Sequence, residues 1–543
     1  MIFFAISIMA LLQFLLLLFL PLTLASPSPS QLTVKTTTGI YTGLVDPSFP
    51  NTRQFRSIPY AQPPVGALRW KPPVAVTPSL RHAYSHRFPP SCSQYMSRNL
   101  TVWTTNITDF AIRLYGQSFT SGSMAQASSE DCLYLAIWTP AKPNATAPED
   151  RKLPVALFLP GGDFVGGGVD VPYQQPTPWV ERTQKHIVVT ANYRVNIGGF
   201  PWAAGLETQN FGILDARMAL EWVHANIGAF GGDNSRIMLW GQSAGGVAVD
   251  MVAHGWPNEP LASSLFMMSG TAMVNISRPD LTHSNFTFVA KNLGCDFPDD
   301  PTAEVECMRH VPMPLIQNFV GQYKDNNTRP TMTFKPAPDE KVVFFNYTTR
   351  DERGYIPKIP ALVSTTSNEL ATLSRYPLTN ITDGPYQPTV NAGTVGVFVC
   401  LASNTTVQRG RRGLTTYRYE YAGNFSSVTP LGWMGAYHAS DIPLIFGTYQ
   451  TPTPGRIGAV ELVTSFERKV AEAMQDHVLA FMEDPEDGLR NRGWPAHDDV
   501  VAELGGQRHM LRFAAGGQVA RNVSAAEIDD ACVLGKEWNP NPS

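Results

Sequence analysis

Short apolar runs bounded by turn residues alternate with segments of helical periodicity through the middle of the chain. The runs at residues 153–159, 187–191 and 236–240 predict buried strands. Between the second and third runs, apolar residues recur at helical spacing over residues 214–227. Buried strands separated by helices predict an α/β fold, in which a mostly parallel central sheet is covered by helices on both faces.

The longest apolar stretch, residues 2–24, predicts a secretory signal peptide over residues 1–25. Thr23 and Ala25 place small residues at the −3 and −1 positions of a cleavage site, and a helix-breaking Ser-Pro-Ser-Pro sequence follows. A positively charged start is missing, so an uncleaved anchor that spans a membrane is the alternative. The abrupt end of the stretch favours cleavage.

The rest of the chain shows no internal repeat, charge run or low-complexity linker between residues 31 and 536. We therefore expect a single α/β domain over residues 26–543, with long insertions between its elements. No later apolar stretch approaches the length of about 18 residues that a membrane helix needs. We expect no membrane span once the signal peptide is removed.

Asn-x-Ser/Thr sequons are scattered along the whole chain, in a number that a cytosolic protein would hardly accumulate by chance. Together with the signal peptide they predict a secreted, extracellular glycoprotein, whose cysteines can form disulfides. The acceptor residues are Asn99, Asn106, Asn144, Asn275, Asn285, Asn326, Asn346, Asn380, Asn404, Asn424 and Asn522.

Composition and charge exclude several classes of function. The chain has 543 residues, with 41 basic against 45 acidic side chains and a formal net charge of −4. This balance argues against a nucleic-acid partner and against a polybasic membrane patch. The six cysteines include no Cys-x-x-Cys pair, which excludes a zinc site or a redox motif of that kind. Their number alone leaves the disulfide pairing open.

A Gly-x-Ser-x-Gly pattern at residues 241–245 follows the third predicted strand, and an apolar helical stretch at 247–253 follows the pattern. A serine at such a strand-to-helix turn has a strained backbone and crowded neighbours, which explains the two glycines. The turn presents the hydroxyl at a helix N-terminus and directs the next N–H toward an oxyanion. Chance is the alternative, but the flanking elements favour Ser243 as a nucleophile.

A serine hydroxyl needs a base to accept its proton, and in this fold the acid and then the base follow the serine along the chain. The candidate bases are His438, His477, His497 and His509. His477 falls in a helical stretch. His438 lies in a glycine-bearing loop after a predicted strand at residues 415–421, where a base at the edge of a sheet belongs.

The acid should also follow a strand. Glu369 comes shortly after the apolar run at residues 359–364, and it would hold the imidazole of His438 in the required tautomer. By spacing alone Asp441 competes for this role, and a solvated surface glutamate is the other alternative.

With these residues in place, the sequence resembles the type-B carboxylesterase/lipase family of α/β-hydrolases, which includes cholinesterases and fungal extracellular lipases. The resemblance covers nearly the whole chain after the leader. The matching motifs are IPYAQPPVG at 58–66 with LRW at 68–70, EDCLYL at 130–135, NYR at 192–194, WV–NI–FGGD within 222–233, and GQSAGG at 241–246.

The resemblance implies a triad of Ser243, Glu369 and His438, and it demotes Asp441. It implies a structural, non-catalytic ion pair between Arg69 and Glu130, and a lid or gorge wall formed by residues 93–131. It also implies three disulfides, which would use all six cysteines: Cys92–Cys132, Cys295–Cys307 and Cys400–Cys532.

For the oxyanion hole, the resemblance implies the backbone N–H groups of Gly162, Asp163 and Ala244. The loop departs from the family at Asp163, where relatives usually have glycine. A carboxylate near a developing oxyanion would oppose it, so we expect this side chain to turn away from the site. Gln242 stands where many relatives have glutamate, and Leu370 replaces a common glycine.

The function predicted from these residues is a secreted esterase that hydrolyses carboxylic esters, lipid esters included, through an acyl-enzyme on Ser243. No metal and no organic cofactor is implied. One alternative is transfer of the acyl group to another alcohol, or tailoring of a secondary metabolite, at the same site. The other is a non-catalytic binding or adhesion protein on this scaffold, although such proteins usually lose the serine or the histidine.

Overall fold

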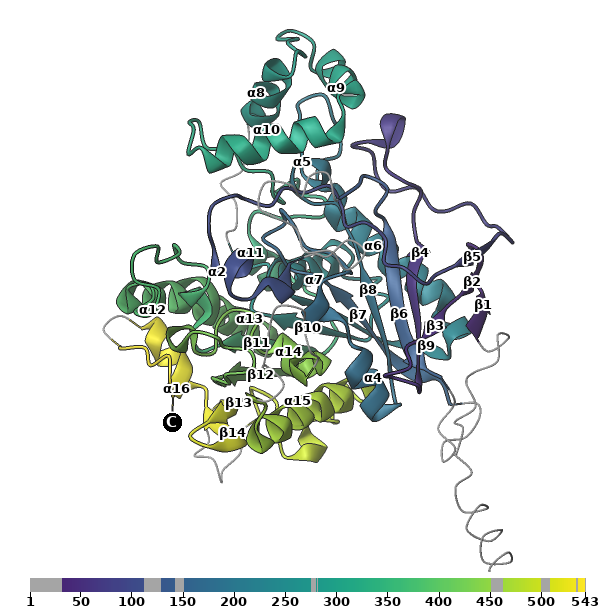
Figure 1. Ribbon diagram of the computed structural model, residues 1–543. Coiled ribbons are helices and arrows are strands. Elements are labelled where there is room, and N and C mark those ends of the chain that lie inside the picture. Colours follow the sequence, from purple (N-terminus) through teal and green to yellow (C-terminus); the bar gives the residue numbers. More distant parts are fainter. Residues whose placement is uncertain are drawn as a thin grey trace, which may run out of the picture.

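The fold is built on a large central sheet. The computed structural model describes residues 32–111, 128–141, 151–274, 280, 282–450, 462–499, 508–533 and 536–542. Within them an 11-stranded sheet runs from the C-terminal part of the chain at one edge to the N-terminal part at the other (Figure 1). In spatial order its strands are β14 (Gln518–Ser524), β13 (His509–Ala515), β12 (Thr416–Tyr421), β11 (Ala361–Thr366), β10 (Ser264–Met268), β9 (Gly232–Gln242), β7 (Leu153–Leu159), β8 (Ile187–Ala191), β6 (Tyr134–Pro140), β4 (Thr52–Pro59) and β3 (Leu44–Val45).

The middle of this sheet is parallel, as the sequence pattern predicts. Neighbouring strands from β13 to β8 all pair in parallel, while β14, β6, β4 and β3 add antiparallel pairs at the two edges. Parallel strands bring their carboxyl ends to one edge of the sheet, and the loops there form the usual site of an α/β protein.

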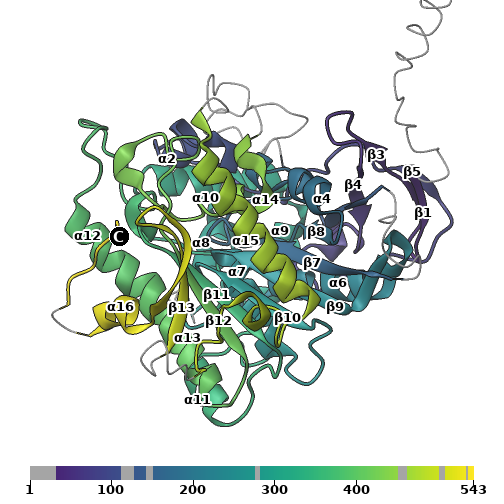
Figure 2. The ribbon, with the colours of Figure 1, turned by 90° about the horizontal axis from the view of Figure 1, so that it is seen from below.

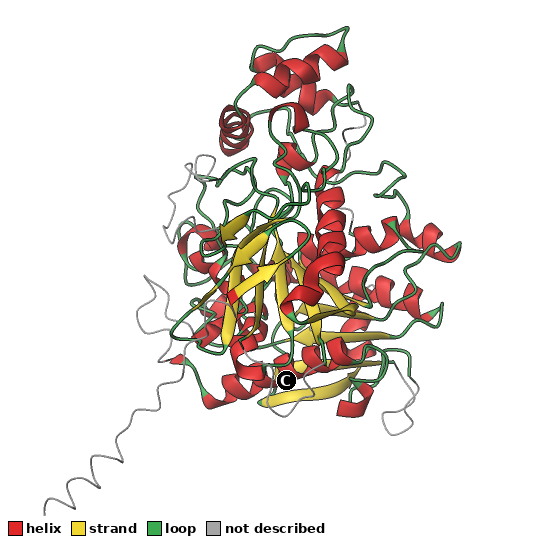
Figure 3. Ribbon diagram, turned by 90° about the vertical axis from the view of Figure 1, so that its right-hand side faces the viewer, coloured by secondary structure: helices red, strands yellow, loops and turns green. Residues whose placement is uncertain are grey.

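Helices cover both faces of the twisted sheet (Figure 3), which confirms the predicted α/β class. Side chains that alternate along β7 divide between two cores: Val155 and Leu157 join one, Ala156 and Phe158 the other. The first core is covered by α6 (Phe211–Asn226), α7 (Ala244–Gly255), α11 (Tyr347–Glu352) and α13 (Cys400–Gly410). The second is covered by α4 (Thr177–Thr183), α14 (Ile442–Phe446) and α15 (Ser465–Glu483), and Figure 2 shows α15 crossing this face.

Three helices form a separate layer at the end of the molecule that Figure 1 places at the top. They are α8 (Ser284–Asn292), α9 (Pro301–His310) and α10 (Met313–Asp325), and their apolar faces enclose a third core with Trp70 and Phe211. Other elements among the described residues are the helices α2 (Val102–Thr105), α5 (Asn196–Gly199), α12 (Gln387–Thr394) and α16 (Ala526–Asp529), and a 3-stranded sheet of β1 (Thr33–Lys35), β2 (Ile40–Thr42) and β5 (His82–Tyr84).

All three disulfides implied by the family resemblance are present: Cys92–Cys132, Cys295–Cys307 and Cys400–Cys532. The bridges act in different places. The first closes the segment before β6, the second joins the loop after α8 to α9, and the third ties the first residue of α13 to the 3₁₀ turn after α16.

One segment of the described chain, Gln387–Gly410, is long and apolar enough by length and composition to cross a membrane. It comprises α12, a π-helical turn at Val395–Val399, and α13. Its α13 part packs against β11 and β12, and Cys400 is held in a disulfide. The segment is thus part of the layer of helices around the sheet. The predicted signal peptide, together with Asn144 and Asn275, lies outside the described residues.

Candidate active site

Ser243 lies at a sharp turn between β9 and α7, on the carboxyl-end edge of the sheet. Its backbone has φ 57° and ψ −126°, a strained conformation for a residue with a side chain. The turn is crowded: a Cβ atom at Gly241 would lie 2.3 Å from the carbonyl carbon of Gly245, and one at Gly245 would lie 2.0 Å from the Leu159 oxygen. Only glycine fits at these two positions, which explains the Gly-x-Ser-x-Gly pattern.

Glu369 follows β11 in a short 3₁₀ turn and is completely buried. Its two carboxylate oxygens have three hydrogen-bond donors. Oε1 accepts from the Ser269 hydroxyl at 2.6 Å and from the Thr366 backbone N–H at 2.7 Å, and Oε2 accepts from Nδ1 of His438 at 2.5 Å. A buried carboxylate needs such partners to remain charged, so this site is built to hold an anion beside the imidazole.

His438 lies in the loop between β12 and α14. The loop is fixed to the Glu369 turn, because the backbone N–H of Asn368 donates to the Ala436 oxygen at 2.9 Å. Since Nδ1–H of His438 donates to Glu369, the lone pair of the neutral ring is on Nε2. The Gln242 side-chain amide lies 3.1 Å from this Nε2 atom, and the Phe398 ring lies 5.0 Å from the imidazole.

The structure therefore brings the three predicted triad residues to one edge of the sheet. Asp441 is not the partner of His438: it is buried and accepts a hydrogen bond from the Tyr419 hydroxyl at 2.9 Å. Burial raises the pKa of Asp441 to about 7, and the nearby Glu369 charge adds to this effect. The other candidate bases lie elsewhere: His477 in α15, His509 in β13, and His497 in the loop after α15.

The loop predicted to form the oxyanion hole follows β7 and lies against the serine turn. A Cβ atom at Gly161 would be 3.1 Å from Cβ of Ser243. Asp163 adopts φ 57°, in the left-handed region. Its carboxylate is 58% exposed and forms an ion pair with Nζ of Lys335 at 2.6 Å. This side chain turns to solvent and is paired, in agreement with the expectation.

Comparisons with known proteins give the family. A profile of the carboxylesterase family matches residues 30–392. The chain is 39% identical over 517 residues to chlorogenic acid esterase of Aspergillus niger, which covers 92% of this chain and 94% of that protein. It is 38% identical over 551 residues to secreted lipase 5 of Gibberella zeae, which covers 96% of this chain and 98% of that protein. The chain belongs to the carboxylesterase family.

Membership confirms the resemblance seen in the sequence and makes the protein a carboxylic ester hydrolase. Among the residues that the structure describes, no group of three or more His, Cys, Asp or Glu side chains could hold a metal ion. The ion pair implied by the resemblance is present: Arg69 binds Glu130 through two hydrogen bonds of 2.6 and 2.7 Å.

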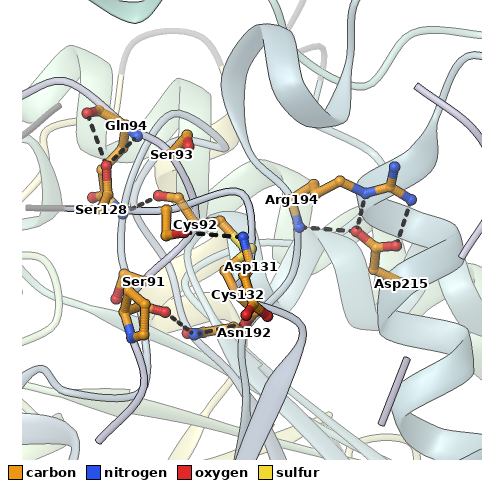
Figure 4. Close-up of a disulfide and its surroundings, with 12 residues drawn as sticks. Ser91, Cys92, Ser93, Gln94, Ser128, Asp131, Cys132, Asn192, Arg194 and Asp215 are labelled. Atoms are coloured by element: carbon orange, nitrogen blue, oxygen red, sulfur yellow. Dashed lines mark hydrogen bonds and ion pairs between the residues drawn. A yellow bond between two sulfur atoms is a disulfide. The ribbon is translucent and has the colours of Figure 1, made fainter. Parts of the chain in front are cut away.

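In this carboxylesterase Gln94 and Asn192, which lie close to the Cys92–Cys132 disulfide (Figure 4), bind residues just after the loop predicted to form the oxyanion hole. The Asn192 amide donates to the Cys132 oxygen at 3.1 Å and accepts from the Val169 N–H at 2.9 Å. Gln94, two residues after Cys92, exchanges hydrogen bonds of 2.9 and 3.0 Å with the backbone of Gly167. The disulfide segment thus fixes the loop that follows Asp163.

Sequence reasoning did not find two residues of this site. Ser269 binds Glu369 from the residue directly after β10, at the same edge where Ser243 follows β9. Its position after a strand was the available signal. Gln242 was noted as a departure from the family, but its contact with His438 joins residues 196 positions apart and had no local signal.

Proposed function

We propose that this carboxylesterase is a secreted serine esterase that works through an acyl-enzyme on Ser243. The observation that carries the proposal is the buried Glu369–His438 pair, joined at 2.5 Å and placed beside the strained Ser243 turn. A strained serine, an imidazole whose Nε2 atom carries the lone pair, and a carboxylate that orients this ring are the three parts that nucleophilic catalysis by serine requires.

In the proposed reaction His438 accepts the Ser243 proton while the serine oxygen bonds to the ester carbonyl carbon. The carbonyl oxygen becomes an oxyanion, which the N–H groups of Gly162, Asp163 and Ala244 stabilise. His438 then gives the proton to the leaving alcohol, and the acyl-enzyme forms. A water molecule repeats the sequence and releases the acid, which restores the serine.

The test is a panel of p-nitrophenyl esters from acetate to palmitate, with chlorogenic acid added, assayed on the wild type and on Ser243→Ala. We expect the substitution to lower kcat by at least about 10³-fold, because it removes the nucleophile. Equal turnover by both proteins would refute the mechanism. The names of the two relatives point toward different esters, chlorogenic acid and lipids, and the panel separates these possibilities.

The same assay addresses the two alternatives. A competing alcohol in the reaction distinguishes acyl transfer from hydrolysis, through the ester product that only transfer yields. For a non-catalytic binding protein, no organophosphonate adduct would form on Ser243. The complete Ser243, Glu369 and His438 set favours catalysis over binding alone.

Secretion and glycosylation are part of the proposal. They are supported by the leader, the three disulfides and the exposed positions of Asn99, Asn326, Asn346, Asn380 and Asn424. Expression with the native leader should deliver the protein to the medium, with a mass that falls on enzymatic removal of N-glycans. An unprocessed protein retained in the cell would contradict this part.

A further inference from the structure

Gln242 makes an unusual contact with the proposed base. It is the last residue of β9 and is only 3% exposed. The amide Nε2 of Gln242 lies 3.1 Å from Nε2 of His438, while the amide oxygen is turned toward Gly161. The amide therefore presents its N–H end to the ring. A buried amide needs a partner, and this ring nitrogen is the partner within its reach.

The contact uses the atom on which the proposed reaction depends. Nδ1–H of His438 is donated to Glu369, so Nε2 has a single lone pair, and this lone pair must accept the Ser243 proton. In the described structure the Ser243 hydroxyl makes no hydrogen bond with His438, and the Gln242 amide donates to Nε2 instead. Gln242 and Ser243 thus compete for one acceptor.

We propose that Gln242 is a positioning residue that caps Nε2 of His438 in the resting enzyme and gives way to Ser243 when an ester binds. This inference rests on the proposed function. A donor at Nε2 binds the neutral imidazole alone, because the protonated ring has no lone pair to offer. The cap therefore favours the form of the ring that can accept a proton, and a variant without the donor loses this preference.

Other groups around the ring also bear on its protonation. Glu369 faces Nδ1, and the buried Asp441 lies three residues further along the same loop. The third neighbour is the apolar Phe398, in the π-helical turn before α13. These groups are unchanged by a substitution at Gln242. A difference between variants at this position therefore isolates the cap.

The test compares Gln242→Met, which keeps the length of the side chain but has no donor, with the wild type. The readout is the rate at which an organophosphonate modifies Ser243, followed by intact mass from pH 4.5 to 9. We expect the acid limb of the rate profile to move up by about 0.5–1 pH unit in Gln242→Met, the size expected for one lost hydrogen bond. Gln242→Glu, which places a negative charge beside the ring, should move the limb up further.

Gln408→Met is the matched control, because Gln408 is also buried but lies on α13, with its amide 3.5 Å from Asn404. Its limb should coincide with that of the wild type. An unmoved limb in Gln242→Met overturns the cap, and Gln242→Leu, which also lacks a donor and adds no charge, provides the same decision if the methionine variant does not fold. If the wild type is labelled and Ser243→Ala is not, the proposed function stands whether or not the limb moves in Gln242→Met. If the wild type is not labelled, both the proposed function and the cap are refuted.

Discussion

At the scale of single residues, Asp163 is the most demanding departure in the site. It stands in a left-handed conformation that favours glycine, in a loop proposed to stabilise a negative charge. Its carboxylate is tolerated there because Lys335 neutralises it at 2.6 Å. The pair is more than half exposed on the Asp163 side, so solvent and salt weaken its effect on the site.

Lys335→Met should therefore lower kcat/KM by about threefold at low ionic strength, and by less in 0.5 M salt, because the unpaired carboxylate opposes the oxyanion. The double variant Asp163→Gly with Lys335→Met removes both charges and should recover the wild-type rate to within about twofold. Steady-state kinetics at two salt concentrations provide the measurement. If the double variant is as slow as Lys335→Met, the lysine acts through packing and the charge argument is wrong.

At the scale of elements, α7 links the proposed nucleophile to a buried ionic cluster. The helix begins directly after Ser243, and His254 near its end lies between two carboxylates. Nδ1 of His254 is 3.1 Å from Asp250, and Nε2 is 2.9 Å from Asp351 of α11. Burial opposes a charge on His254, but the two carboxylates prevail and raise its pKa to about 10.

The cluster predicts how stability changes with pH. Because the folded pKa of His254 is raised above its unfolded value of about 6.5, the stabilisation is fully present below about pH 6.5 and is lost as pH rises toward about 10. His254→Gln should lose roughly 3–5 kcal/mol at pH 6.5, because it removes the positive charge that lies between two buried carboxylates. The loss should be smaller at pH 9.5.

Urea unfolding at pH 6.5, 8 and 9.5 measures this difference between the wild type and His254→Gln. The exposed His310 is the matched control, since its side chain is 82% exposed and His310→Gln should follow the wild type at every pH. A constant gap between wild type and His254→Gln across the range would show that the histidine is neutral in the folded protein.

At the scale of the whole molecule, the sequence predicted the parts that depend on local pattern. β7 and β8 coincide with the apolar runs, whereas β9 begins four residues before its run, because Gly232 pairs with Leu153 of β7 ahead of the apolar residues. The Ser243 turn was predictable since its glycines are a local steric requirement. Contacts that need the assembled sheet, such as Ser269 with Glu369 and Gln242 with His438, follow from strand order, which no local pattern specifies.

The disulfides act at this largest scale, because their effect depends on how much chain each one closes. Cys400–Cys532 joins residues 132 positions apart and ties the C-terminal part of the chain to the helix next to Phe398, while Cys295–Cys307 spans only 12 positions within one helical layer.

In the chain-entropy description, removal of the long bridge should cost about 5 kcal/mol and removal of the short bridge about 3 kcal/mol. Paired Cys→Ala variants, unfolded in denaturant under identical conditions, measure both losses. Cys400→Ala/Cys532→Ala should also lower esterase activity at elevated temperature, since α13 continues the segment that carries Phe398 against His438. Equal losses from the two bridges would mean that native contacts around each one, and not the length of chain it closes, determine its contribution.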